Sequence, residues 1–171
     1  MRRVVFAHPT DTCRYLRVRD EWDRITTTYK YIPNGELSIE SVKEIECTVS
    51  DFNSLRSIYG AMWLREKAYQ ETKREVWEIE GQIEFMLDEW PGINPFIEIE
   101  WKDKVVVRKY VELLGLDYRA GLFGAVDQIY MRELGIPRDI LNEQTPIITF
   151  DSPPQQYAPS RISQLLAQTS L

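Results

Sequence analysis

Alternation of apolar and polar residues predicts a series of β-strands in the first hundred residues. Strand side chains point to opposite faces in turn, so residues two apart share a face. Residues 96–101 read FIEIEW, which aligns Glu98 with Glu100 on one face. The same alternation marks six further segments, at 2–6, 12–20, 24–32, 42–49, 69–79 and 82–90. Short polar links between several of them favour antiparallel hairpins.

Apolar residues spaced by three or four predict three helices. The first spans 52–62 after a cap at Ser50 or Asp51, the second spans 103–115, and the third covers roughly 119–134. Asp and Ser are favoured caps at the start of a helix, and glycine commonly follows its end. Strands and helices together predict an α+β fold, with an antiparallel sheet whose apolar face is covered by helices.

The length of 171 residues fits one domain. We assign that domain to residues 1–150 and predict a flexible C-terminal tail at 151–171, where Pro, Ser and Gln dominate.

Composition is that of an ordinary soluble globular protein, with 43% hydrophobic and 28% charged residues. No apolar run approaches the roughly 18–20 residues that cross a bilayer, and the start of the chain turns polar too soon for a secretory signal. We therefore predict a cytoplasmic protein that does not associate with membranes. The net charge of −6 argues against nucleic acid as a partner.

Like charges are paired on the polar faces of the predicted strands. Such pairs repel modestly, and they are expected where a group of opposite sign binds, although an antiparallel sheet can also simply expose a polar face to water. If the sheet curls into a barrel, acidic and basic pairs meet inside it. A polyphosphate with its divalent metal suits both, because arginine binds phosphate and carboxylates bind magnesium. The pairs are Arg17 with Arg19, near Lys30; Glu44 with Glu46; and Glu98 with Glu100.

Five short motifs resemble, in order, the core of the CYTH proteins, also called triphosphate tunnel metalloenzymes. This family contains class IV adenylyl cyclases, thiamine triphosphatases and inorganic triphosphatases. Each motif is weak alone, but the ordered set is specific and extends from about residue 12 to 101. The motifs are LRVR at 16–19, TTTYK at 26–30, KEIE at 43–46, TKREVW at 72–77 and LDEWPGINPFIEIE at 87–100.

The resemblance implies an eight-stranded antiparallel tunnel barrel with helices on its outside and a triphosphate with Mg²⁺ or Mn²⁺ inside. Motif positions carry the roles over to this chain, and no catalytic residue is assigned. The implied phosphate ligands are Arg17, Arg19, Lys30 and Arg74, and the implied metal ligands are Asp88, Glu98 and Glu100. Glu44 and Glu46 would be additional tunnel carboxylates, which either bind metal or brace the arginines.

The leading functional prediction is metal-dependent binding and hydrolysis of a triphosphate, with tripolyphosphate, thiamine triphosphate and ATP as candidate substrates. Attack by water gives hydrolysis, whereas attack by a ribose hydroxyl gives cyclic AMP, as in a class IV-type adenylyl cyclase. The bound groups are similar in both reactions, so the motifs leave both open.

One element of the family pattern has no counterpart in this sequence. CYTH proteins open with a Glu-x-Glu-x-Lys strand and a helix, whereas residues 2–9, RRVVFAHP, already align with the second strand. The barrel is then expected to be incomplete, with an exposed edge and fewer carboxylates. Three interpretations follow: a truncated or mis-started gene product, a homodimer that closes the gap, or a non-catalytic polyphosphate- or nucleotide-binding domain.

Overall fold

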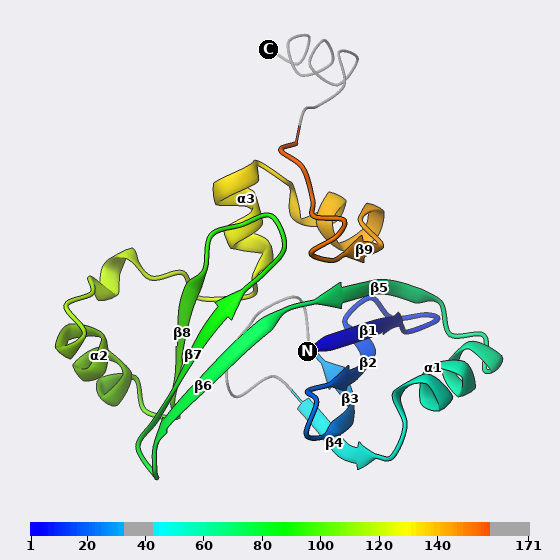
Figure 1. Ribbon diagram of the computed structural model, residues 1–171, viewed down its shortest axis with the longest axis horizontal. Coiled ribbons are helices and arrows are strands. Elements are labelled where there is room, and N and C mark those ends of the chain that lie inside the picture. The colour runs from blue at the N-terminus through cyan, green and yellow to red at the C-terminus, as the bar shows by residue number, and fades with distance from the viewer. Residues whose placement is uncertain (33–42, 158–171) are drawn as a thin grey trace, which may run out of the picture.

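The computed structural model describes residues 1–32 and 43–157 and has a mixed α+β fold, as predicted (Figure 1). The strands are β1 (Arg2–Ala7), β2 (Arg14–Asp20), β3 (Ile25–Tyr31), β4 (Lys43–Val49), β5 (Glu66–Glu71), β6 (Lys73–Ile79), β7 (Ile83–Glu89), β8 (Phe96–Glu100) and β9 (Ile147–Ile148). The helices are α1 (Phe52–Ala61), α2 (Lys104–Leu113) and α3 (Asp127–Leu134), with a short 3₁₀ turn η2 (Tyr118–Ala120) and a π-helical turn η3 (Ile140–Gln144).

The described strands form two sheets. One has six strands in the order β4-β3-β2-β1-β5-β9, and the other has three in the order β6-β7-β8. All pairs are antiparallel except β5 with β9. The segment predicted as one strand at 69–79 is two strands, because the chain leaves the first sheet at Thr72 and enters the second (Figure 1).

Helix α1 covers the apolar face of the six-stranded sheet. Its N-terminus is capped by Asp51, whose Oδ1 accepts a hydrogen bond from the Ser54 backbone N–H at 2.6 Å. The helix contributes Phe52 to a buried cluster with Val4, Phe6 and Val18 of the sheet. This packing confirms the first predicted helix and fixes which face of the sheet is apolar.

Helix α2 lies against the outer face of the three-stranded sheet. It starts at the Asp103 cap and is followed by Gly115 at φ +73°, as the sequence predicts. Its Tyr110 ring meets the edge of the Phe85 ring of β7 at a centroid distance of 5.8 Å. The opposite face of this sheet is therefore the one that turns toward the rest of the molecule.

The third predicted helix is shorter than its apolar spacing indicated. Helix α3 begins only at Asp127, and the residues before it form the separate turn η2 and an irregular link. Gly124 in that link has φ +147°, a conformation that a helix does not contain. The prediction of a continuous helix at 119–134 was therefore wrong in its first half.

A second core forms where α3, η3 and β9 meet the end of β7. Its buried residues are Trp90, Tyr130, Ile136, Leu141 and Ile148. The Tyr130 hydroxyl donates a hydrogen bond to the Pro91 carbonyl at 2.7 Å. This core holds the C-terminal third of the chain against the sheets.

The predicted tail at 151–171 is described only as far as residue 157. The Tyr157 backbone N–H donates to the Leu134 carbonyl at 2.9 Å, and the Tyr157 ring packs against the second core. Residues 151–157 thus lie on the body of the domain, and 158–171 lie outside the described residues.

Within the described residues, no helix combines the length and apolar character needed to cross a membrane.

Candidate anion-binding site

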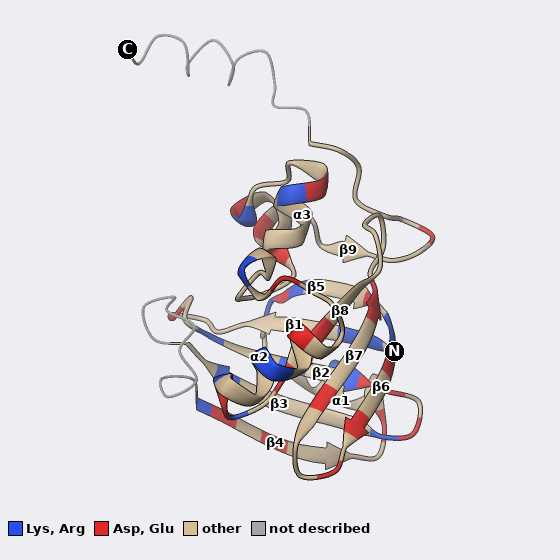
Figure 2. Ribbon diagram, turned by 90° about the vertical axis from the view of Figure 1, so that its left-hand side faces the viewer, with Lys and Arg blue, Asp and Glu red and all other residues tan. Residues whose placement is uncertain are grey.

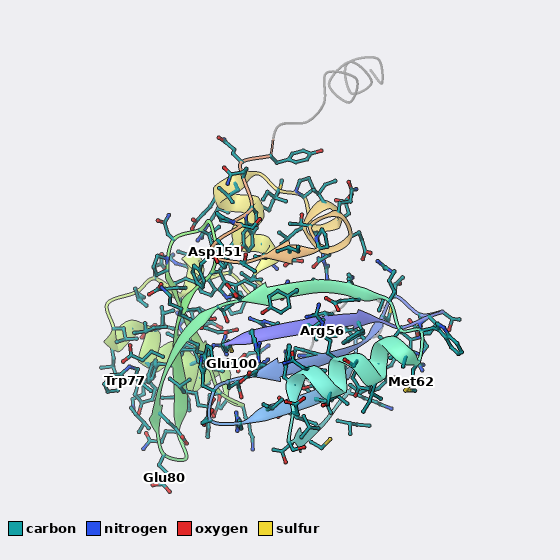
Figure 3. All side chains as sticks on the ribbon, turned by 45° about the vertical axis from the view of Figure 1, so that its right-hand side comes forward. Arg56, Met62, Trp77, Glu80, Glu100 and Asp151 are labelled. Atoms are coloured by element: carbon teal, nitrogen blue, oxygen red, sulfur yellow. The ribbon has the colours of Figure 1, made fainter. Side chains whose placement is uncertain are left out.

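The charged side chains predicted from the sequence lie on two sheet faces that look toward each other. Strands β1 to β4 present theirs on the face away from α1, and β6 to β8 present theirs on the face away from α2. Figure 2 shows basic and acidic segments in both sheets, with prominent acidic stretches on β6, β7 and β8. In Figure 3, Glu100 lies on the side of its sheet that faces β1 and β2, whereas Trp77 lies at the outer side.

Arg74 is at the centre of the acidic group. Its Nε and Nη2 donate to the two carboxylate oxygens of Asp88, each at 2.6 Å, and Nη2 also donates to Glu98 Oε2 at 2.8 Å. The third nitrogen, Nη1, lies 3.0 Å from the Met86 sulfur. The strand register produces this arrangement, because Arg74 pairs with Asp88 across β6–β7 and Met86 pairs with Glu98 across β7–β8. Asp88 is only 1% exposed.

The pKa values of this group reflect burial and crowding. Burial raises the pKa of Glu98, with support from the negative charges of Glu100 and Asp88, and together they outweigh Arg74. Burial acts to lower the pKa of Arg74, but its hydrogen bond to Asp88 and the surrounding carboxylates raise it overall. Arg74 therefore stays charged and holds Asp88. Around Glu98, the effects that disfavour its negative charge outweigh the attraction of Arg74.

A second group joins β2, β3 and β4 through looser contacts. Arg17 Nη2 lies 3.6 Å from Glu44 Oε1 and 4.0 Å from Glu46 Oε2, and Lys30 Nζ lies 3.4 Å from Glu44 Oε2. The Thr28 hydroxyl donates to Glu46 at 2.7 Å. Of the two roles that the sequence left open for Glu44 and Glu46, this geometry matches the bracing of the cations.

Arg3 is a site residue that the sequence did not single out. It lies in β1 directly opposite Arg19 of β2, is 9% exposed, and stacks its guanidinium 4.4 Å from the ring centroid of Trp90. Burial, followed by the positive charges of Arg19, Arg17 and Arg74, lowers the pKa of Arg3 to about 9. Parity along RRVVF places Arg3 on the polar face, but its position opposite Arg19 depends on register, which the sequence does not reveal.

Arg3, Arg17 and Arg19 form what we call the arginine cluster. The Nε atom of each is buried and has no hydrogen-bond partner among the described residues. Two nearby donors share this property, the Thr26 hydroxyl and the Trp90 indole N–H. Burial and then the charge of Arg19 lower the pKa of Arg17. Glu21 accepts a hydrogen bond from Arg19 Nη1 at 3.1 Å, and Glu44 and Glu46 lie 3.6 to 4.0 Å from Arg17, so Arg3 is the member without a carboxylate partner among the described residues.

Buried like charges with free N–H groups are the arrangement expected of an anion site. Arginines directly opposite each other in a sheet repel, and a buried donor without a partner is costly. An anion with several oxygens relieves both costs, because each guanidinium can donate to it in a fork. The arrangement can therefore bind and orient a compact polyanion.

Two of the three predicted metal ligands, Asp88 and Glu98, accept hydrogen bonds from Arg74. Among residues 1–32 and 43–157, no group of three or more His, Cys, Asp or Glu side chains is placed to hold a metal ion. Both oxygens of Asp88 and one of Glu98 accept hydrogen bonds from Arg74 instead. As arranged, Asp88, Glu98 and Glu100 do not fit a divalent metal, and the metal site stays a prediction.

Comparison with known proteins supports the fold alone. No family model matches this chain, and no curated protein matches it. It is similar in structure to a conserved hypothetical protein from Pyrococcus furiosus, with 20% sequence identity, a TM-score of 0.55 and coverage of 69% of this chain and 74% of that one. The PH1012 protein from Pyrococcus horikoshii gives the same values.

Proposed function

We propose that this protein binds a triphosphate, inorganic or organic, between the charged faces of its two sheets. The observation that carries this proposal is the arginine cluster, whose three Nε atoms are buried on one sheet face without hydrogen-bond partners among the described residues. Phosphate oxygens accept such donors in pairs, and three arginines match the charge of a chain of phosphates better than that of a single one. Lys30 extends the cationic face toward β4.

In this proposal the two sheets are opposite sides of the triphosphate tunnel that the CYTH resemblance implies. The support is local: the charges of Arg74 and Asp88 in the small sheet act on Arg3 in the large one. Arg3 also contacts Trp90, which directly follows β7, and its Nη2 lies 3.4 Å from the hydroxyl of Thr72 at the junction of the sheets. A ligand held by the arginine cluster would therefore face the acidic group across the gap.

Thermal unfolding with tripolyphosphate tests the binding proposal. A ligand that binds only the folded state stabilises it by about 2.7 kcal/mol at roughly 100 times its Kd, so we expect a rise in Tm. The double variant Arg17→Ala, Arg19→Ala should abolish the rise.

The matched control is Arg108→Ala on α2, where the exposed side chain pairs with Glu112 and lies over the Tyr118 ring, on the helix that covers the outer face of the small sheet. This variant should keep the full rise in Tm. An equal response of the double variant and the control would contradict the proposal.

Hydrolysis or cyclisation of the bound triphosphate is the second candidate function. It is favoured by the position of Glu98 and Glu100, whose sheet face is turned toward the arginine cluster. Incubation with tripolyphosphate, thiamine triphosphate and ATP in Mg²⁺ or Mn²⁺ tests it by product analysis. Released phosphate identifies a hydrolase and cyclic AMP a cyclase, whereas a rise in Tm without any product identifies a binding domain.

A further inference from the structure

All three guanidinium nitrogens of Arg74 contact residues of the small sheet. Two nitrogens hold both oxygens of Asp88 and one oxygen of Glu98 at 2.6 to 2.8 Å, and the third faces Met86. A paired arrangement of this kind, charge-assisted and partly buried, is among the strongest hydrogen-bonding geometries in proteins. The residue that motif matching assigns to the phosphate is thus occupied by carboxylates.

A divalent metal would need the same oxygens. Magnesium takes oxygen ligands at about 2.0–2.1 Å in nearly octahedral geometry, so at Asp88 it competes for charge and space with a guanidinium that already engages both carboxylate oxygens. A metal at Asp88 and Glu98 weakens their hydrogen bonds to Arg74 and adds positive charge beside a guanidinium whose charge already acts on Arg3 of the arginine cluster. Metal binding therefore works against a preformed ion pair and against charge repulsion.

We infer that Arg74 is an internal counter-cation that excludes divalent metals from Asp88 and Glu98, so that the protein takes its triphosphate free of metal. The inference rests on the proposed function and deepens it. The arginine cluster neutralises the phosphates, and Arg74 neutralises the carboxylates on the opposite sheet, which would otherwise repel them. One built-in positive charge thus supplies the electrostatic role of a metal ion at these carboxylates.

Manganese titration without any anion tests the exclusion directly, by electron paramagnetic resonance of free Mn²⁺. The wild-type protein should bind Mn²⁺ weakly. Arg74→Gln removes the charge and frees the carboxylates, so its affinity for Mn²⁺ should rise by about tenfold or more. Arg74→Lys keeps a positive charge at the same place and should stay close to wild type. Wild-type binding as tight as that of Arg74→Gln would overturn the inference.

Tripolyphosphate titration with and without EDTA tests whether the protein binds its triphosphate free of metal. For the wild type, Kd by calorimetry should agree within about twofold in the two conditions. Arg74→Gln should bind more weakly in EDTA and recover when Mn²⁺ is added. Loss of wild-type binding in EDTA would overturn the inference, and this arm needs no variant to fold.

The two proposals fail in different ways. If tripolyphosphate binds in neither condition, the proposed function is wrong, while the manganese titration still judges the exclusion. If tripolyphosphate binds only with metal, the proposed function stands and the inference about Arg74 is wrong. Far-UV circular dichroism of both Arg74 variants confirms that each comparison is made between folded proteins.

Discussion

A buried arginine without a nearby carboxylate is unusual, and Arg3 has none within hydrogen-bonding distance among residues 1–32 and 43–157. Its described contacts are the face of Trp90 and one 3.4 Å hydrogen bond to the Thr72 hydroxyl, while Arg19 lies directly opposite. The charge is thus kept at a cost to the free protein. Binding of an anion gives a reason for that cost.

Arg3→Met is expected to stabilise the free protein while weakening its binding of tripolyphosphate. Methionine packs on the Trp90 ring without a charge, and replacing poorly compensated buried charge by apolar groups commonly adds about 1–4 kcal/mol of stability. Urea unfolding and calorimetry measure the two effects. A less stable variant with unchanged affinity would show that Arg3 is structural.

Glu98→Gln is expected to gain stability relative to the wild type as the pH rises from about 4.5 toward neutrality. The pKa of Glu98 is raised in the folded state, because of burial first and then its acidic neighbours, so the folded protein holds the proton more tightly than the unfolded chain. The contribution of Glu98 to stability is therefore complete below its unfolded pKa and is lost as the pH rises through its folded pKa.

Glutamine has no such titration, so the difference in free energy of unfolding between variant and wild type should grow with pH. Urea unfolding at several pH values between 4 and 7 measures this difference. A constant difference across that range would contradict the assigned direction of the pKa shift.

Among the elements, the strands of the site were the most predictable from sequence. Period-two alternation located seven segments, and parity correctly placed Arg17 with Arg19 opposite Leu16 and Val18, which pack toward α1. Pairing between strands was not predictable, because it depends on register and on contacts distant in sequence. For this reason the sequence revealed the paired charges but not Arg3, and it assigned Arg74 to phosphate rather than to Asp88.

Elements of the C-terminal third were less predictable. The two-residue strand β9 and the π-turn η3 are too short for any periodicity, and they exist because Ile148 and Leu141 fill the second core. The start of α3 was predicted too early because apolar spacing continues through a link that contains Gly121 and Gly124. Tertiary packing, not local pattern, determines these boundaries.

Gly92→Ala is expected to destabilise the loop between β7 and β8 by about 1 kcal/mol or more. Gly92 has φ +84°, and an added Cβ would lie 2.9 Å from the Pro154 carbonyl oxygen. Gly60→Ala in α1 is the matched control, since nothing lies within 4 Å of its added Cβ, and it should be neutral or stabilising. Thermal unfolding compares the Tm of the two variants. Equal Tm changes would contradict a close contact between Gly92 and residues 151–157.

For the whole molecule, the distribution of charge matters more than its sum. The chain carries a net charge of −6, yet it gathers the buried cationic arginine cluster on one sheet face. A negative exterior disfavours extended polyanions such as nucleic acids, whereas a recessed cationic face remains open to small ones. The charge of the proposed triphosphate ligand is opposite to that of this face, as the proposal requires.

The chain passes from β5 in the large sheet to β6 in the small sheet at Thr72, and this junction determines which β6 side chains face inward. Ala68, Gln70, Thr72 and Arg74 follow the same parity across the junction, so the face that looks inward on β5 continues on β6. One extra residue at this point would turn Arg74 outward and bring Lys73 and Glu75 inward. The lining of the gap is thus set by the spacing of the chain at a single joint, and an insertion there could exchange its charges while leaving every strand in place.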